Sequence, residues 1–283
     1  MHRRAALLTP LAIVAARPVA AQTGAVMVAE PAGATDAPMT VHVHRPAAWR
    51  PGGPVVAVLH GVLRNGAEYR DAWVAQSEAQ GFLLLVPEFA AAKFPGVLWY
   101  NFGHAGDDGG RVFPRASWVF GALDRAVAGA RAQLGAGQGG FALYGHSAGA
   151  QFAHRYVLLG GGAAERVIIA NAGWYTMPDL GADFPYGMAG LGDAALLPAA
   201  FARRVVVLLG EADVNPNHPS LRRNAAADRQ GLHRYARGQA FFAAAAAQAA
   251  AMGAPFNWVL STVPGVGHSN AGMAAAAGSF LLG

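Results

Sequence analysis

Short apolar runs alternate along the chain with segments in which apolar residues recur at helical spacing. Continuous apolar runs are typical of strands that are covered on both faces of a sheet. The segment 40–44 instead alternates apolar and polar residues, which is typical of a half-exposed edge strand. The predicted strands are residues 26–30, 40–44, 55–59, 82–86, 141–144, 166–170, 204–210 and 256–262.

Helical spacing predicts the elements between these strands. We expect helices over residues 67–79, 117–134 and 239–252, one directly after residue 149, and a last one that ends near residue 281. Strands that alternate with helices predict an α/β protein with a mostly parallel central sheet of about eight strands. Such sheets bind ligands at the carboxyl ends of their strands, so we expect the site there.

Two long connections interrupt this alternation. Residues 88–114 and 174–200 have no clear period and are rich in glycine and aromatic residues. Long loops inside compact domains are usually functional. We therefore expect two ordered loop or lid excursions beside the site.

The sequence Gly145-His146-Ser147-Ala148-Gly149 lies between a predicted buried strand and a predicted helix. It matches G-x-S-x-G, the pattern of a nucleophilic serine on a sharp strand–helix turn. The helix that follows points its N-terminal amides at the serine, where a developing oxyanion needs donors. Because the chain contains 37 glycines, the pattern alone also fits a plain turn with a solvated serine. The flanking strand and helix favour the nucleophile.

A serine nucleophile needs a base within reach, and the base needs a carboxylate to orient it. In enzymes with this motif the acid, and then the base, follow the serine along the chain. Asp213 lies just past the strand 204–210, and His268 lies just past the strand 256–262. We therefore predict Ser147 as nucleophile, Asp213 as acid and His268 as base.

Several other side chains compete for these roles. Glu211 is the nearest rival acid, but it lies closer to the strand end. His218 and His233 are rival bases, but both precede the last predicted strand. His146 lies inside the elbow, where we expect it to pack and to orient its neighbours.

The oxyanion of the reaction needs two backbone donors. The N–H of Ala148, directly after the nucleophile, is the first. The second is expected after the strand 55–59, where Gly61 permits a close backbone approach. We choose the N–H of Val62, with Leu63 as the alternative; the competing interpretation of this segment is a plain strand-ending turn.

Composition limits the class of protein. The chain has 283 residues, of which 54% are hydrophobic and 13% charged, so it can bury the core of a single domain over residues 22–283. The formal charge is +5, but no basic stripe with interleaved aromatics is present, so we expect no nucleic-acid partner. The chain has no cysteine and hence no disulfide.

Residues 1–21 have the pattern of a secretory signal peptide. Arg3 and Arg4 supply a positive start, residues 5–16 are apolar, and Val19-Ala20-Ala21 offers small residues for cleavage. We expect an exported protein, periplasmic or secreted. The apolar stretch is too short to span a bilayer, and no later segment is suitable, so we expect no stable membrane insertion.

Four short motifs carry a resemblance to a known family: Leu-His-Gly at 59–61, the elbow at 145–149, Gly-Glu-Ala-Asp at 210–213 and Gly-Val-Gly-His at 265–268. Together they resemble small secreted esterases of the α/β-hydrolase fold, in particular the polyhydroxyalkanoate depolymerase and feruloyl esterase-like group. The resemblance implies hydrolysis of carboxylic esters through an acyl-enzyme, without a metal or an organic cofactor. Secreted members often contain disulfides, which this chain lacks, and its nucleophile is serine, unlike the cysteine of dienelactone hydrolases.

Substrate contacts are harder to assign. Trp174 and Tyr175 follow a predicted strand end, and Leu63 follows the oxyanion loop, so we expect these three side chains to contact a small-molecule or polymeric ester. The alternative is that the aromatic residues cap the core. A peptidase or an acyltransferase would use the same three catalytic groups, and a non-catalytic binding protein is the rival from another class.

Overall fold

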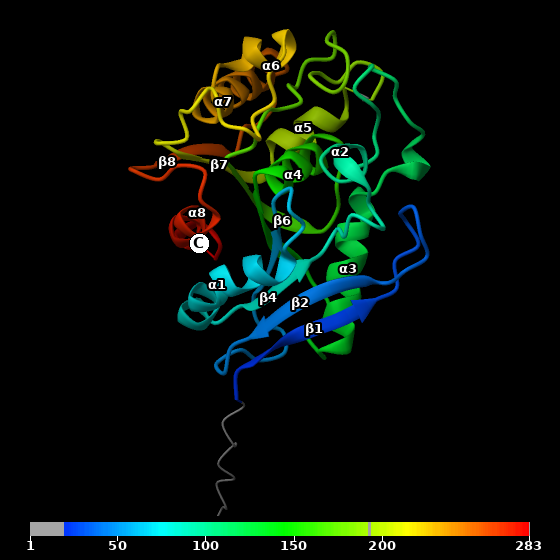
Figure 1. Ribbon diagram of the computed structural model, residues 1–283, viewed down its shortest axis with the longest axis vertical. Coiled ribbons are helices and arrows are strands. Elements are labelled where there is room, and N and C mark those ends of the chain that lie inside the picture. Colours follow the sequence, from blue (N-terminus) through cyan, green and yellow to red (C-terminus); the bar gives the residue numbers. More distant parts are fainter. Residues whose placement is uncertain (1–19, 192–193, 283) are drawn as a thin grey trace, which may run out of the picture.

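The computed structural model describes residues 20–191 and 194–282, and most of the predicted leader 1–21 lies outside these residues. The strands are β1 (Gln22–Val28), β2 (Met39–Arg45), β3 (Val55–Leu59), β4 (Leu83–Pro87), β5 (Phe141–His146), β6 (Ala164–Ala170), β7 (Arg204–Gly210) and β8 (Trp258–Val263). Within the described residues they form one eight-stranded sheet in the order β1-β2-β4-β3-β5-β6-β7-β8 (Figure 1). β1 pairs antiparallel with β2, as does β2 with β4, and all other neighbours are parallel. The predicted α/β class, with a mostly parallel sheet of about eight strands, is confirmed.

Helices cover both faces of this sheet (Figure 1). The α-helices are α1 (Gly66–Gln80), α2 (Gly96–Trp99), α3 (Phe120–Gln133), α4 (Ala148–Leu158), α5 (Leu196–Phe201), α6 (Ala225–Gln230), α7 (Arg234–Ala251) and α8 (Asn270–Ala277), and the 3-10 turns are η1 (Arg115–Ser117) and η2 (Gly278–Phe280). Helices α1 and α8 pack against each other on one face, whereas α3, α4 and α7 pack on the other. No helix of the described residues is both long and apolar enough to cross a membrane.

The buried strands divide their side chains between two apolar clusters. In β3, Val56 and Val58 join the cluster beneath α1 and α8, while Ala57 and Leu59 join the larger cluster beneath the other helices. Successive side chains of a strand point to opposite faces, so a strand covered on both faces must be apolar at every position. This is why the central strands are visible in the sequence as continuous apolar runs.

The sequence-based boundaries fail where the apolar pattern is weak. The first strand begins at Gln22, four residues before the predicted start at Val26, because this edge strand is largely exposed and is held by its pairing with β2. Helix α7 begins at Arg234, before the predicted 239, and its start is fixed by His233 Nδ1, which accepts the N–H of Ala236 at 3.2 Å. The helices α2, α5 and α6 span only four to six residues each, too few to show a period.

The two predicted excursions contact each other above the sheet. Phe102, from residues 88–114, packs edge-on against Trp174 and Phe184, from residues 174–200, with ring centroids 5.5 and 5.4 Å apart. These contacts order both connections. They form one wall beside the residues that directly follow β5.

Candidate active site

Ser147 occupies a strained position between β5 and α4. Its φ of 57° and ψ of −114° place a non-glycine residue in the left-handed half of φ space, which costs of order 1–3 kcal/mol. The turn is fixed on both sides, because Ser147 N–H donates to Ala170 O at 3.0 Å and Ser147 O accepts from Gln151 N–H at 3.1 Å. The Ser147 side chain therefore stands at the carboxyl edge of the sheet.

The two elbow glycines are required by close backbone approach. A Cβ on Gly145 would lie 2.4 Å from Gly149 O, and a Cβ on Gly149 would lie 2.4 Å from Leu59 O. Both obstacles are backbone atoms, which cannot swing aside. The G-x-S-x-G pattern is thus a packing requirement of the β5–α4 turn, where it bends tightly and lies against the end of β3.

Gly149→Ala should lower the free energy of unfolding by about 2 kcal/mol, because the added methyl overpacks a rigid backbone contact. Urea denaturation would measure this change. Gly24→Ala is the matched control: a Cβ there meets no atom within 4 Å, so its effect should stay within about 0.5 kcal/mol. Equal stability of the two variants would contradict the packing argument.

The structure brings Asp213 and His268 to Ser147. His268 Nε2 lies 3.0 Å from Ser147 Oγ, and His268 Nδ1 lies 2.7 Å from Asp213 Oδ2. Asp213 is buried, with 3% of its side chain exposed, while His268 is half-buried at the mouth of the site. An imidazole between a hydroxyl and a carboxylate can take a proton from the first while the second holds its ring in place.

The rival side chains are engaged in other contacts. Glu211 Oε1 accepts the Thr262 hydroxyl at 2.7 Å in an exposed position, and His233 caps α7. His218 stacks edge-on at 5.6 Å from the His268 ring, but its Nδ1 is engaged by the backbone N–H of Ser220 at 3.2 Å. Each of them has another structural contact.

Arg234 is a neighbour of Asp213 that the sequence analysis missed. Its Nη1 lies 3.4 Å from Asp213 Oδ1, and its Nη2 donates to Ser220 Oγ at 2.9 Å. Burial lowers the pKa of Arg234, and the Asp213 carboxylate opposes that shift. In the sequence Arg234 is only one of several arginines near the start of a helix, and nothing there indicates that its side chain turns inward.

His146 packs behind the predicted base. Its Nδ1 is hydrogen-bonded to the Tyr69 hydroxyl at 2.9 Å, and its ring lies 4.8 Å from that of His268. Burial lowers the pKa of His146, and His268 and Arg234 add to the shift. A neutral imidazole here fits the orienting position expected from the sequence.

Asn171 links the two loops that deliver Asp213 and His268. It follows β6 with a φ of 49°, its Oδ1 accepts the N–H of Gly210 at 2.8 Å, and its Nδ2 donates to Gly267 O at 3.1 Å. Gly210 lies three residues before Asp213, and Gly267 precedes His268. One buried amide therefore sets the spacing between the acid and the base.

Asn171→Gly should lower kcat for a hydrolysed ester by about 10- to 100-fold with little change in KM, because small misplacements of catalytic groups cost rate. Glycine keeps the positive φ and removes only the side chain. Steady-state kinetics would test this, with Asn257→Gly as control because that exposed side chain donates to Ala202 O, outside both loops. A rise in KM at constant kcat would assign Asn171 to substrate binding instead.

The predicted oxyanion donors lie in one cavity with the serine. Gly61 is next to the serine, since an added Cβ would be in van der Waals contact with Ser147 Cβ at 3.9 Å and would clash with the Tyr69 hydroxyl at 2.8 Å. Val62 follows it, and Ala148 begins α4; both line the cavity that contains Ser147. The loop after β3 and the start of α4 thus face the same space.

Two cavities meet at Ser147. One, of about 470 Å³, contains His268, Leu63 and Tyr69; the other, of about 390 Å³, contains Ala148 and Trp174. Val62, Ser147 and Ser220 line both. We call them the His268 cavity and the Ala148 cavity.

Two of the three predicted substrate contacts border these cavities. Leu63 is 81% exposed at the rim of the His268 cavity, and Trp174 lines the Ala148 cavity. The expectation for Tyr175 is wrong. Its side chain is fully buried and stacks on Phe241 at 4.4 Å, so it packs in the core, away from both cavities.

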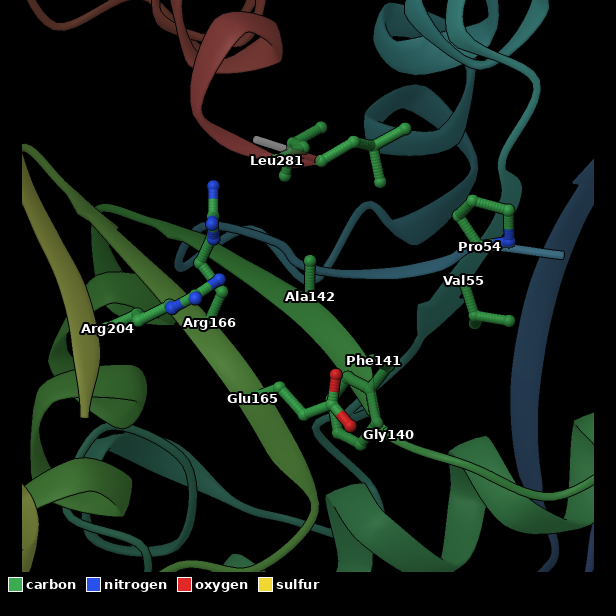
Figure 2. Close-up of a pocket in the computed structure, with 10 residues that line it drawn as sticks. Pro54, Val55, Gly140, Phe141, Ala142, Glu165, Arg166, Arg204 and Leu281 are labelled. Atoms are coloured by element: carbon green, nitrogen blue, oxygen red, sulfur yellow. The ribbon is translucent and has the colours of Figure 1, made fainter.

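A further cavity of about 470 Å³ lies at the other end of the strands (Figure 2). Arg166 and Arg204, which are paired across β6 and β7, lie side by side in it, and Glu165 extends from the same strand. Its described lining residues include no serine, histidine or aspartate. This cavity therefore lies apart from Ser147, Asp213 and His268, which stand at the carboxyl edge of the sheet.

Comparison with solved structures places this chain in a family. The chain is 37% identical to poly(aspartic acid) hydrolase-1 from Sphingomonas sp. KT-1, covering 94% of this chain and 100% of that one, with a TM-score of 0.86. It is also 37% identical to LpqC, the poly(3-hydroxybutyrate) depolymerase from Bordetella parapertussis, covering 92% and 89% of the two chains, with a TM-score of 0.85. The siderophore hydrolase EstB from Aspergillus nidulans, at 12% identity, 96% and 98% coverage and a TM-score of 0.55, shares the fold.

Models of protein families give no match, and neither do curated proteins. The two structures at 37% identity span nearly the whole chain and are named as a hydrolase and a depolymerase. Their likeness confirms the family expected from the four motifs. The chain belongs to the esterase-like hydrolases of the α/β-hydrolase fold.

Proposed function

We propose that this protein is a serine esterase that cleaves carboxylic esters through an acyl-enzyme intermediate. The observation that carries the proposal is the hydrogen-bonded series from Ser147 through His268 to Asp213, which begins at a cavity and ends in the protein interior. Ser147 is the nucleophile, His268 the general base and Asp213 the acid that orients it.

Acylation begins when Ser147 Oγ attacks the ester carbonyl and His268 Nε2 takes the hydroxyl proton. Asp213 holds the other ring nitrogen as N–H donor and stabilises the imidazolium. The carbonyl oxygen becomes an anion that accepts the N–H groups of Val62 and Ala148. The tetrahedral intermediate then expels the alcohol, which receives the proton from His268.

Deacylation repeats these steps with water. His268 removes a proton from the water that attacks the acyl-serine carbonyl, and the same backbone donors hold the second oxyanion. Collapse releases the carboxylic acid and returns the proton to Ser147 Oγ. The groups invoked are side chains and backbone amides of this chain, so the proposal includes no metal or organic cofactor.

The relatives leave the bond type open. LpqC is named for poly(3-hydroxybutyrate), a polyester, and the Sphingomonas enzyme for poly(aspartic acid), a polyamide. Amide hydrolysis with the same groups is therefore the second candidate. We favour a small or polymeric ester because an alkoxide leaves more readily than an amide nitrogen does, so the same groups suffice for it.

We also propose that residues 1–21 are removed on export and that the mature enzyme acts in the periplasm or outside the cell. Support comes from the charged start, the apolar middle and the small residues before Gln22. We propose no nucleic-acid partner and no stable membrane insertion for the mature chain.

A labelling experiment tests the mechanism. The mature protein should hydrolyse short p-nitrophenyl esters and should be modified by a fluorophosphonate at Ser147, identified by mass spectrometry of the peptide that contains it. Prior labelling should abolish hydrolysis in proportion to the modified fraction. Hydrolysis that persists in fully labelled protein would refute the serine mechanism.

A further inference from the structure

We infer that the Ala148 cavity binds the acyl part of the substrate and selects acyl groups that carry a carboxylate. The inference rests on the proposed function and names the substrate class. It depends on which cavity takes which half of the substrate and on the charges that line each of them.

The base determines the assignment of the two cavities. The departing alcohol oxygen receives its proton from His268 Nε2, so the leaving group lies on the side of the serine where His268 stands. That side is the His268 cavity, which also contains Asn270 and Ala271. The acyl group therefore extends into the Ala148 cavity, beside the first amide of α4.

The Ala148 cavity is lined by positively charged side chains and by no carboxylate of the described residues. Arg222 and Arg234 border it, together with Asn101 and Gln151, and no Asp or Glu is among its described lining residues. The His268 cavity has the opposite character: Glu68 lines it, and no Lys or Arg does among the residues that the structure describes. The acyl side of the substrate would therefore face arginines, and the alcohol side would face a glutamate.

A third guanidinium lies directly beneath the Ala148 cavity. Arg155 is fully buried, donates to Asn101 O at 2.8 Å and Gln151 O at 2.9 Å, and lies 4.6 Å from the Trp174 ring centroid. In residues 20–191 and 194–282 it has no carboxylate partner within ion-pair distance. Burial and the charge of Arg222 lower the pKa of Arg155 to about 9. Positive charge is thus in excess on this side of the serine.

Arg222 is the group best placed to hold an anion. Its guanidinium lies 4.8 Å from the Trp174 centroid and 5.6 Å from that of Tyr186, so its position is fixed by two rings. Its Nη2 donates to Asp108 Oδ1 at 2.7 Å, but Asp108 is 52% exposed, and exposed pairs contribute little. A substrate carboxylate can use the other N–H groups of Arg222 or displace Asp108.

A carboxylate fits these donors better than other anions do. The planar guanidinium matches the two oxygens of a carboxylate, and the Asn101 and Gln151 amides, which are hydrogen-bonded to each other at 3.2 Å, line the same cavity. The apolar side chains of Phe102, Leu221 and Trp174 would cover the methylene groups between the carbonyl and the carboxylate.

The test compares matched esters. Mono-p-nitrophenyl esters of linear diacids, from adipic to suberic, carry a free carboxylate at the far end of the acyl chain. The matched substrates are the mixed diesters of the same acids, which keep the p-nitrophenyl group and carry a methyl ester in place of that carboxylate. For the best acid we expect kcat/KM to favour the free carboxylate by about tenfold at low ionic strength, because one charge-assisted contact is of that size. A ratio of one or less for every acid would overturn the inference.

Two substitutions should move this ratio in opposite directions. Arg222→Gln should lower it by about tenfold, and Asp108→Asn should raise it about threefold, because it frees Arg222 for the substrate. Arg229→Gln, an exposed arginine of α6 outside both cavities, is the matched control and should leave the ratio unchanged. The inference fails if Arg222→Gln and Arg229→Gln behave alike.

Binding without turnover separates this inference from the proposed function. In Ser147→Ala protein, calorimetry should show tighter binding of monomethyl suberate than of dimethyl suberate, and Arg222→Gln should remove the difference. If the parent cleaves no ester but this difference is present, the esterase proposal fails and the carboxylate site stands. Equal binding of both ligands would overturn the site itself.

Discussion

Ser147→Ala should reduce kcat/KM for a p-nitrophenyl ester by about 10⁵-fold or more, to the level of the residual oxyanion and binding contributions. In the proposed mechanism, the hydroxyl that lies 3.0 Å from His268 Nε2 is the protein group that bonds to the acyl carbon. Alanine removes it and leaves the backbone strain at φ 57° in place, so the fold should be kept. Initial rates and thermal unfolding, measured on the same preparation, would check both expectations.

Ser279→Ala is the matched control for this prediction. Ser279 is exposed near the end of the chain, and its hydroxyl donates to Ala276 O at 3.0 Å, outside both cavities. Its activity should equal that of the parent. If Ser147→Ala kept more than a few per cent of the activity, another nucleophile would have to be sought and the elbow would be only a structural turn.

The parts of the site that could be predicted from the sequence are those tied to strand ends. Ser147, Asp213 and His268 each follow a predicted strand, and parallel strands bring their carboxyl ends to one edge. The glycine at 145 is required by a local contact with Gly149 O, whereas the glycine at 149 is required by Leu59 O of the neighbouring strand β3, and the G-x-S-x-G pattern records both. Residues that directly follow predicted strands can therefore be assigned to the site from the sequence alone.

The parts that could not be predicted depend on contacts between distant segments. Arg234 reaches Asp213 across 21 residues, and Asn171 reaches Gly267 across 96. The burial of apolar residues is visible in the sequence as a periodic pattern, but the burial of a single Arg or Asn leaves no such pattern. Neither residue can therefore be distinguished in the sequence from an exposed polar residue. The prediction for Tyr175 is wrong for a related reason. Its neighbour Trp174 lines the cavity, whereas the Tyr175 ring is buried in the core, and the sequence does not distinguish the two positions.

Substitution of Asn171 and substitution near Arg234 should have different effects on the enzyme. Asn171 carries no charge and acts through the spacing of two loops, so its loss should be felt in kcat alone. Arg234 places a buried cation 3.4 Å from the carboxylate that orients the base. Any change at Asp213 therefore affects both the imidazole and this guanidinium.

Asp213→Asn should lower kcat by about 10⁴-fold. The carboxylate now accepts a hydrogen bond from His268 Nδ1 at 2.7 Å, which leaves Nε2 free to accept the Ser147 proton. An amide NH₂ in its place favours the tautomer that carries the proton on Nε2, and that nitrogen can then no longer act as the base. Stopped-flow measurement of the p-nitrophenol burst would show acylation itself slowed.

The same substitution should also destabilise the fold, because Arg234 would lose its carboxylate neighbour in a buried position. Glu211→Gln separates the two effects: this neighbouring acid bonds Thr262 in an exposed position, so its removal should change kcat by less than about twofold. A Glu211→Gln loss as large as that of Asp213→Asn would reassign the acid to Glu211. If Asp213→Asn retained most of its kcat while only the midpoint of urea unfolding fell, Asp213 would be a counterion of Arg234, and the orientation of His268 would have to come from elsewhere.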